Sequence, residues 1–435
     1  MRPFAGLRYR RKDLSEVLAP PYDVITPEDQ ERLHQRDPHN AARLELGYGA
    51  TGDTGPDSRY ERAARTLDLW REEGVLGYDE EPCLYPYAQD FTLREETRSR
   101  VGVLSAVRLT PFEEGVVLPH EGTLSGPRED RRRLTLACQA QISPVLALHD
   151  DRDGQIAALI SGMMSGEPVA AAETDGERHR LWRRGRDQAT ARYCELLGRG
   201  PLYIADGHHR YETALTVSRE LRQAHPEAGP DAAFNCVLML LCPSQQPGMV
   251  ILPTHRVLRL GAGAQWERLT ANLQRRFQRQ ALECPAGRPL EAAQRLVEML
   301  NQTDGATRFG MYTKAQGCSL LLVRPEFIPQ QPGPGGIDEL GTVLIHRLLI
   351  DPVLGSEAPA SSVDYVMDEG EALRRVDDGR ADCALFLRPT TVEQVKRVAA
   401  ARLRMPGKST YFYPKAPTGL VMSDISPGRA IPSRP

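Results

Sequence analysis

The stretch PLYIADGHHRYETAL, residues 201–215, holds a strand, a turn and a helix start in immediate succession. Leu202 to Ala205 form a short apolar run typical of a buried strand, Asp206-Gly207 is a turn signal, and the residues from Tyr211 onward have the spacing of an amphipathic helix. A glycine turn that leads into a helix N-terminus is a natural anion site, because the first backbone N–H groups lack partners and carry partial positive charge. The sequence therefore predicts that this turn binds a phosphate-bearing ligand such as a nucleotide.

The side chains of the turn favour the same prediction. His208, His209 and Arg210 fall on the first helical turn, where imidazole and guanidinium groups can donate to phosphate oxygens. Gly207 lets the backbone approach a ligand closely. The phosphate-binding candidates are Gly207 and Arg210, and the catalytic candidates are Asp206, His208 and His209. In the alternative interpretation Asp206 only caps the helix, the histidines lie on the surface and Arg210 pairs with a nearby carboxylate.

Length and element order indicate the architecture. At 435 residues the chain exceeds the size at which one hydrophobic core keeps growing, so two or three packed units are expected. Helical and strand-like segments are mixed along the chain, which predicts an α+β (mixed α/β) fold. The predicted divisions are an N-terminal α/β unit at 1–150, a unit carrying the DGHHR turn at 151–260, a C-terminal α/β unit at 261–424 and a flexible tail at 425–435.

Charge and cysteine content argue against several classes of protein. A net charge of −3 leaves no positive surplus to attract nucleic acid or an anionic membrane. The sequence shows no secretory signal and no apolar run of about eighteen residues, so a cytoplasmic protein is expected. The eight cysteines form no C-x-x-C pair and the histidines no H-x-x-x-H, so no zinc site is expected. Walker and Rossmann glycine motifs are also missing.

Several local signals predict individual elements. Thr26 can cap a helix that begins near Pro27. Alternating apolar residues predict two antiparallel strands that end near residue 112. A helix is expected at 337–350 and another at 391–404.

A second polar cluster lies in HEGTLSGPREDR, residues 120–131. Phosphoryl transfer needs cations for the phosphates, a carboxylate to accept the proton of the acceptor, and often carboxylates for Mg²⁺. Glu121 is the candidate base, and Asp130 joins Asp206 as a possible magnesium ligand. The phosphate-binding candidates of this cluster are His120, Thr123 and Arg131. Alternatively the segment is a solvated loop that leads into a salt-bridged helix.

Two further segments contribute candidates for the nucleotide. Pro20-Pro21-Tyr22-Asp23 is a rigid turn whose Tyr22 and Asp23 could contact a base or ribose, although it could equally be the turn before a helix. Lys408, Ser409 and Lys415 lie near the end of the chain. Lysine is rare here and arginine common, so two lysines in one loop suggest a need for compact ammonium groups.

Five blocks together resemble a known family over nearly the full chain. They are APPYDVI at 19–25, HEGTLSGPREDR at 120–131, IADGHHRYETAL at 204–215, LPTHRVL at 252–258 and MPGKSTYFYPK at 405–415. The family is the uncharacterised one of bacteria and archaea catalogued as domain of unknown function 1015. The DGHHR turn is also similar to that of ParB-like and sulfiredoxin-like nucleotide-binding proteins, which include free-serine kinases.

The resemblance implies a ParB-like nucleotide-binding module that takes ATP or ADP with Mg²⁺ and a small-molecule substrate. The leading hypothesis is a kinase that transfers phosphate to a hydroxyl acceptor such as free serine. A non-catalytic nucleotide-binding regulatory or scaffold protein is the alternative. A DNA-associated protein in the manner of ParB is disfavoured, because the sequence has no clear helix-turn-helix and no basic surplus.

Overall fold

The computed structural model describes residues 1–49, 58–123, 125–260, 263–283, 289–302, 306–355 and 359–432. The chain has the predicted mixed α+β architecture and divides into two compact units. Unit 1 comprises Met1–Pro119, Thr123–Val250 and Pro414–Pro435, and unit 2 comprises His120–Gly122 and Ile251–Tyr413. These divisions differ from the boundaries expected near residues 150 and 260, because strands from both sides of residue 150 enter one sheet.

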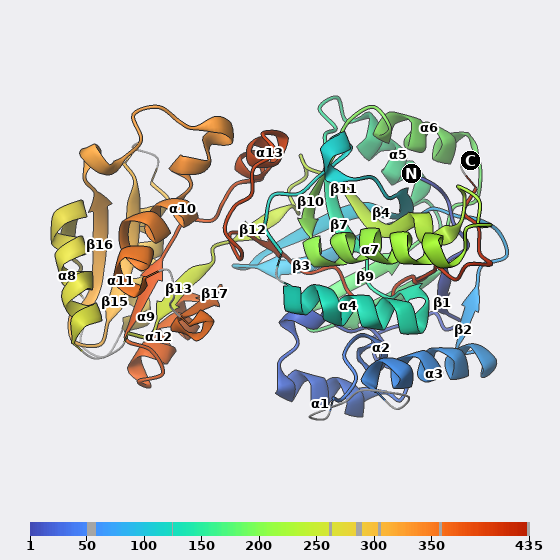
Figure 1. Ribbon diagram of the computed structural model, residues 1–435, viewed down its shortest axis with the longest axis horizontal. Helices are drawn as coiled ribbons and strands as arrows, with labels where there is room; N and C mark the ends of the chain where they lie inside the picture. Colours follow the sequence, from blue (N-terminus) through green and yellow to red (C-terminus); the bar gives the residue numbers. More distant parts are fainter. Residues whose placement is uncertain are drawn as a thin grey trace. The chain divides into compact units, whose positions relative to one another are not determined.

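Unit 1 is built on an eight-stranded mixed sheet in the order β5-β10-β7-β11-β4-β3-β9-β8 (Figure 1). The predicted antiparallel pair appears as β3 and β4, which continue into the β8–β9 hairpin at one end of the sheet. The strands are β3 (Tyr85–Leu93), β4 (Glu96–Arg108), β5 (Val117–Leu118), β7 (Val145–His149), β8 (Ala170–Thr174), β9 (Glu177–Leu181), β10 (Leu202–Asp206) and β11 (Cys236–Pro243). Two short pairs, β1 (Leu7–Tyr9) with β2 (Leu76–Tyr78) and β6 (Ala140–Gln141) with β20 (Ser423–Asp424), complete the strands of this unit.

The helices of unit 1 cover its sheet through apolar faces. Side chains of α5, α6 and α7 join those of β4, β7, β10 and β11 in one core. The helix predicted near Pro27 is α1, and Thr26 caps it by accepting a hydrogen bond from the Asp29 amide. The helices are α1 (Pro27–Arg36), α2 (Ala42–Glu45), α3 (Arg59–Glu72), α4 (Ser125–Cys138), α5 (Gln155–Met163), α6 (Gln188–Leu197) and α7 (His208–Ala224), with a 3₁₀ turn, η1, at Tyr22–Val24.

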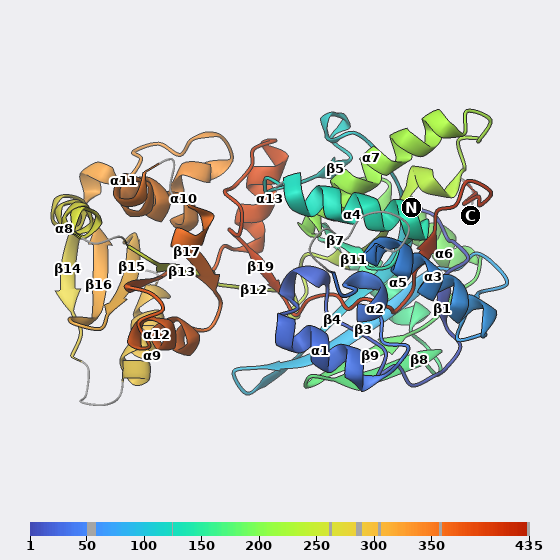
Figure 2. The ribbon, with the colours of Figure 1, turned by 60° about the horizontal axis from the view of Figure 1, so that its bottom comes forward.

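Unit 2 contains an antiparallel six-stranded sheet in the order β14-β16-β15-β18-β13-β17. One apolar cluster joins α8 and the α10–α11 region to one face, and a second joins α9 and α12 to the other (Figure 2). The strands are β13 (His255–Leu258), β14 (Phe277–Ala281), β15 (Arg308–Thr313), β16 (Gly317–Val323), β17 (Val363–Val366) and β18 (Cys383–Phe386). The helices are α8 (Ala264–Arg276), α9 (Pro289–Leu300), α10 (Gly341–Ile345), α11 (Asp351–Leu354), α12 (Glu369–Asp377) and α13 (Val392–Ala400). The strands β12 (Val250–Leu252) and β19 (Tyr411–Tyr413) pair separately.

The helix expected at 337–350 is not continuous. A 3₁₀ segment at Pro334–Glu339 precedes α10, and a π-helical turn at His346–Ile350 joins α10 to α11. Gly335 and Gly336 have positive φ angles of 65° and 66°, so the chain changes direction where the apolar spacing suggests a helix start.

Beyond Asp424, where the sequence suggests a flexible tail, the described residues pack on unit 1. Ile425 is 1% exposed and packs in a cluster with Val217, Leu221 and Phe234. The Ile431 amide donates a hydrogen bond to the Asp231 carbonyl at 2.8 Å. The sequence SPGRAIPSRP looks featureless, but its isoleucine and the preceding Ile425 fill apolar sites on unit 1.

A row of buried polar groups crosses β9, β3 and β4 in unit 1. His179 pairs in register with Gln89, and Gln89 with Arg100, which is fully buried. Gln89 donates to the Glu177 carboxylate at 2.6 Å and to the Lys415 carbonyl at 3.1 Å. Burial raises the pKa of Glu177 to about 7, although Gln89 and Arg100 favour its ionised form.

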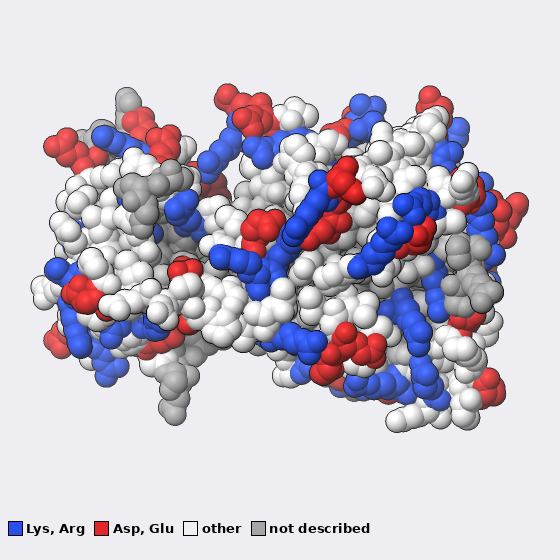
Figure 3. All heavy atoms as spheres, turned by 90° about the horizontal axis from the view of Figure 1, so that it is seen from above, with Lys and Arg blue, Asp and Glu red and all other residues white. Residues whose placement is uncertain are grey.

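No helix of the described chain is long and apolar enough to cross a membrane. On the face shown in Figure 3, Lys and Arg side chains are interspersed with Asp and Glu, without an extended patch of one sign.

We expect Ile425→Ala to lower the free energy of unfolding by about 2–4 kcal/mol, because it removes buried methyl groups and leaves a cavity. Val116→Ala is the control, since Val116 is 45% exposed in the same unit and its truncation should change stability by less than about 0.5 kcal/mol. Urea unfolding curves measure both. If Ile425→Ala and Val116→Ala changed the free energy of unfolding equally, the segment after Asp424 would not pack on unit 1.

The raised pKa of Glu177 predicts a pH-dependent stability difference. A carboxyl whose pKa is higher in the folded state stabilises the fold fully below the unfolded pKa, and this contribution is lost as pH rises through about 7. Glu177→Gln should therefore have the same free energy of unfolding as the wild type near about pH 4, and a free energy of unfolding higher by on the order of 2 kcal/mol near about pH 8. The exposed Glu173, on neighbouring β8, provides the control Glu173→Gln, which should show no such trend. A pH-independent difference for Glu177→Gln would contradict the prediction.

Candidate phosphate-binding site

A β-bulge at the end of β10 sets the direction of Asp206. Tyr203 pairs with Leu148 and Ile204 with Ala147, but the next pair is Asp206 with Leu146, so Ala205 is an extra residue. A shift of one residue moves the following side chain to the other face of a sheet. The bulge therefore turns Asp206 away from the face that carries Ile204.

Gly207 then makes the turn into α7 in a conformation that favours glycine. Its φ is 86°, in the left-handed region. A Cβ atom at this position would lie 2.9 Å from Nε of Arg210, because the guanidinium folds back over the turn. Any side chain here would displace Arg210. α7 begins at His208, three residues before the amphipathic pattern becomes clear at Tyr211.

Asp206 lies between two cations. Arg210 Nη2 donates to Asp206 Oδ2 at 2.6 Å, and Lys415 Nζ donates to Oδ1. Burial opposes ionisation, but Lys415 and Arg210 together outweigh it and hold the pKa of Asp206 well below its usual range. One carboxylate with two cations leaves this cluster with a net charge of +1.

Arg210 has further donors. Its Nη1 group donates to the carbonyl of Pro144, and its Nε group is buried with no hydrogen-bond partner among the described residues. The guanidinium is therefore fixed in orientation by Asp206 and Pro144, while part of its donor capacity is unused.

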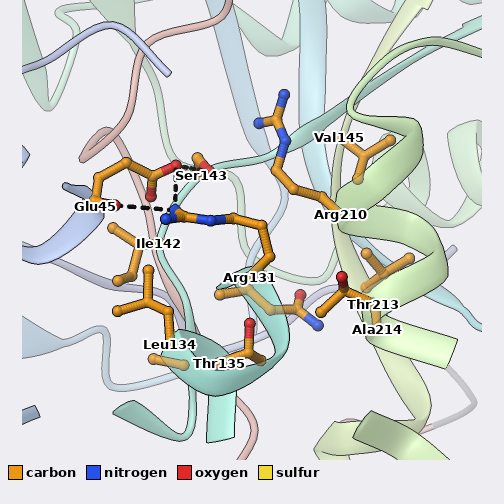
Figure 4. A pocket seen from close by; sticks show the side chains of 13 residues that line it. Glu45, Arg131, Leu134, Thr135, Ile142, Ser143, Val145, Arg210, Thr213 and Ala214 are labelled. Carbon is orange, nitrogen blue, oxygen red and sulfur yellow. Dashed lines mark hydrogen bonds and ion pairs between the residues drawn. The ribbon is translucent and has the colours of Figure 1, made fainter. Parts of the chain in front are cut away.

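A small cavity of about 40 Å³ lies beside Arg210, between α4, α7 and the strand residues that follow Cys138 (Figure 4). Arg131 also lines it and binds the buried Glu45, with Nη1 at 2.9 Å from the Glu45 carbonyl and 3.4 Å from its carboxylate. Ser143 donates to the same carboxylate at 3.0 Å. The volume is enough for about three water molecules.

Tyr22 lies against this cluster. The guanidinium carbon of Arg131 is 4.0 Å from the centre of the Tyr22 ring, a cation–π contact. Burial raises the pKa of Tyr22, with Asp23 adding to the effect and Arg131 and Arg210 opposing it. The PPYD turn thus belongs to the same region of unit 1 as Arg131 and Arg210, with Asp23 exposed beside it.

The first turns of α4 and α7 lie side by side. Thr213 of α7 donates to the Arg128 carbonyl at 3.3 Å, and farther along the helices Arg132 pairs with Glu220 at 3.1 Å, so the helices run parallel. Parallel helices bring two positive dipole ends to one edge of the unit. Thr123 and Arg128 both donate to the Glu212 carboxylate there.

The sequence-predicted candidates divide between the units. Unit 1 brings together Tyr22, Asp206, Gly207, Arg210 and Lys415, with Arg131 beside them. The remaining candidates of this unit are Asp23, Thr123, Asp130, His208 and His209. His208 is buried on the first turn of α7, and His209 is half-buried.

Four candidates belong to unit 2, where they have structural contacts. His120 Nε2 lies 2.9 Å from Thr410 Oγ1, and the Glu121 carboxylate accepts hydrogen bonds from the Thr410 amide and hydroxyl at 2.9 and 2.8 Å. The Lys408 carbonyl accepts from Thr254 Oγ1 at 2.9 Å. Ser409 is buried and donates to the Pro406 carbonyl at 2.7 Å.

The carboxylates proposed for magnesium do not fit a resident metal ion. Asp130 accepts from Arg59 at 2.6 Å, from Tyr60 at 2.9 Å and from Arg131, while Asp206 is paired as described above. In the described part of the chain, no group of three or more His, Cys, Asp or Glu side chains could hold a metal. The seven cysteines described there are free thiols.

Sequence reasoning missed Glu45, Ser143 and the Pro144 carbonyl. Glu45 is an acid at the end of a four-residue helix, 86 residues before Arg131, and its neighbours carry no motif. Its partnership with Arg131 depends on long-range contacts of the fold, which also bring Ser143 to the Glu45 carboxylate. Glu212 lies inside the quoted motif and was detectable as an acid one residue after Tyr211.

Several solved structures resemble the chain. A conserved hypothetical protein from Pyrococcus furiosus has a TM-score of 0.37 at 13% identity, covering 74% of this chain and 95% of that one. A free serine kinase in complex with AMP has the same TM-score and identity, with 74% and 92% covered. SbnI with a C-terminal truncation, from Staphylococcus aureus, has a TM-score of 0.37 at 9% identity, with 75% and 89% covered.

No curated protein matches the chain. The family described as "Protein of unknown function (DUF1015)" matches residues 1–347, which contain all of α4, β10, the DGHHR turn and α7. This match spans most of the sequence, and the chain belongs to the DUF1015 family.

Proposed function

We propose that unit 1 binds the phosphate groups of a nucleotide at the Asp206–Arg210 turn. One observation carries the proposal: Arg210, folded over Gly207 and fixed by Asp206, lies with Lys415 at the N-terminal end of α7. The cluster has one positive charge in excess, and the helix end adds backbone N–H donors. An anion with several acceptor oxygens satisfies both features.

Asp206 organises this site. It stays ionised because Lys415 and Arg210 hold its pKa low, so it orients both cations at any pH near neutrality. A bound phosphate would share the guanidinium and ammonium groups with Asp206 rather than order them itself. Cations that are already fixed lose little freedom on binding, which favours affinity.

The finer proposal is phosphoryl transfer to a hydroxyl acceptor such as free serine, in keeping with the resemblance of the DGHHR turn to free-serine kinases. The hydroxyl oxygen attacks the terminal phosphorus, the bond to the nucleotide oxygen breaks, and a carboxylate takes the hydroxyl proton. Glu121 is the proposed base, and Asp23, exposed next to Tyr22, is the second candidate. Any Mg²⁺ would arrive on the nucleotide phosphates, since Asp130 and Asp206 are paired with cations.

A nucleotide-binding switch without chemistry is the second candidate function. The closed ion cluster of Asp206, Arg210 and Lys415 favours it, because an arriving phosphate would redistribute these contacts between β10, α7 and the segment that begins at Pro414. DNA binding draws no support from the interspersed charges in Figure 3.

Arg210→Ala should weaken ADP and ATP binding by about 1.5–3 kcal/mol, because a charge-assisted contact to phosphate is lost. Arg210→Lys should recover part of the lost affinity, since it keeps a positive charge beside Asp206 but lacks the guanidinium group that can donate to two phosphate oxygens at once. Arg219→Ala is the matched control, an exposed arginine on the same helix. Isothermal calorimetry measures all four proteins. Unchanged affinity in Arg210→Ala would remove Arg210 from the site.

Glu121→Gln separates the kinase from the switch. The amide oxygen can still accept from Thr410, so the local fold is retained while basicity is removed. We expect about 10²-fold or greater loss of phosphoryl transfer to free serine with unchanged nucleotide affinity. Mass-detected phosphoserine is the readout, with ATP, ADP and pyrophosphate as donors.

Two outcomes would redirect this proposal. Full turnover in Glu121→Gln would move the role of base to Asp23, which Asp23→Asn then tests. Absence of phosphoserine with every donor, despite tight nucleotide binding by the wild type, would replace the kinase with the switch.

A further inference from the structure

Gln89 is a fully buried amide in the large sheet of unit 1. It lies on β3, opposite Arg100 of β4 and His179 of β9. Residues that pair directly across strands point to the same face of a sheet, so these three side chains form one row. A buried amide costs free energy unless its donors and acceptor are bonded, so the partners of Gln89 decide what it does.

Three partners fix the orientation of the Gln89 amide. Arg100 Nη2 donates to Gln89 Oε1. A guanidinium has only donors, so the atom that faces it must be the amide oxygen. Gln89 Nε2 then donates to the Glu177 carboxylate at 2.6 Å and to the Lys415 carbonyl at 3.1 Å. Both protons of the amide nitrogen are therefore used.

The amide is locked in this orientation. A flipped amide would place its NH₂ group against the Arg100 guanidinium and its oxygen against the Glu177 carboxylate. Arg100 is 0% exposed and would lose the hydrogen bond that it donates to Gln89. Leaving a buried charged group without such a bond costs more than losing an ordinary hydrogen bond. The Lys415 carbonyl therefore has a donor whose direction is fixed.

Lys415 connects this amide to the phosphate-binding turn. Its carbonyl is bound by a side chain of β3, and its Nζ donates to Asp206 at the end of β10. The strands β4, β11 and β7 lie between β3 and β10 in the sheet. A lysine stem is flexible, so the place of its ammonium depends on where its backbone is held. Gln89 is thus linked to the Asp206 cluster through a single residue.

The chain beyond Lys415 is held at a second point. The Thr418 amide donates to the Ala19 carbonyl at 2.8 Å, and the Ala19 amide donates to the Thr418 carbonyl at 3.3 Å. These contacts and that of Gln89 all lie within unit 1. The backbone from Lys415 to Thr418 is therefore tied to unit 1 at both ends.

We propose that Gln89 is a positioning residue of the phosphate site, which fixes the Lys415 backbone and thereby the place of the ammonium beside Asp206. Gln89 acts through Lys415 and not on the ligand. The inference rests on the function proposed for the Asp206–Arg210 turn. An ammonium that is already held in place loses less freedom when it binds an anion, so the Gln89 amide contributes to affinity.

Calorimetry of inorganic phosphate and of ADP with the full chain tests this role. Gln89→Met keeps the length of the side chain and removes its amide, and it should weaken binding about 3- to 10-fold. In the Lys415→Met background the same change should have no further effect, because Gln89 acts through Lys415. Gln246→Met is the matched control and should leave affinity unchanged, since Gln246 exchanges hydrogen bonds of 2.7 and 2.9 Å with Val101 of β4.

A second variant keeps the test valid if the first one folds poorly. Gln89→Met alone leaves the buried Arg100 without its Gln89 acceptor. Gln89→Met combined with Arg100→Met replaces both partners by apolar groups, which is close to neutral for stability, and it should show the same loss of affinity. If Gln89→Met weakened binding equally with and without Lys415→Met, its role would be general support of the fold, and the proposal would be overturned.

The environment of Lys415 is also measured without any ligand. The chain has five lysines, so labelling lysine with ¹³C at Cε gives five resonances, and Lys415→Arg assigns the one sought. Gln89→Met should shift that resonance toward the value of the exposed Lys12, whose own resonance should not move. An unchanged Lys415 resonance would contradict the proposal. A shifted resonance in a chain that binds neither phosphate nor ADP would support Gln89 as the positioning residue and overturn only the function proposed for unit 1.

Discussion

The carboxylate of Asp206, whose side chain is only 14% exposed, needs a positive partner, and its ion pairs with two cations hold the site of unit 1 together. A charged group removed from water is costly unless other charges compensate it. Arg210 comes from the first turn of the following helix, and Lys415 from a segment 209 residues later. This ion cluster joins strand β10, helix α7 and the chain that returns from unit 2, so every other group of the site is placed relative to it.

The same cluster explains why the turn must have its particular shape. The bulge at Ala205 directs Asp206 toward Lys415, and Gly207 leaves room for Arg210 to fold back over the backbone. In the neighbouring cluster a carboxylate is again paired with a guanidinium, that of Arg131. The Glu45 carboxylate there has one cationic partner, and Ser143 donates a further hydrogen bond to it. The Nε group of Arg210, by contrast, is a buried donor that has no hydrogen-bond partner among the residues that the structure describes.

Local signals made the strand, the turn and α7 predictable, since each depends on residues adjacent in sequence. The cap at Thr26 was predictable for the same reason. The bulge was not, because it depends on the register of β10 against β7. Nor was the β8–β9 hairpin, whose charged sequence hides the buried His179. The packed segment after Asp424 also escaped prediction, because two isoleucines among prolines and polar residues form no periodic pattern. Long-range partners such as Lys415 and Glu45 require the fold itself.

The origin of Lys415 has a consequence for the order of events during synthesis. All of the sheet in unit 1 has been made once Pro243 has left the ribosome, yet the ammonium group that completes the Asp206 cluster is added only after the whole of Ile251–Tyr413 has been translated. Domains generally fold as they emerge. Until then Asp206 has Arg210 as its cationic partner, and the addition of Lys415 converts this neutral pair into a cluster with one excess positive charge. The turn therefore acquires its excess positive charge only after unit 2 has been made.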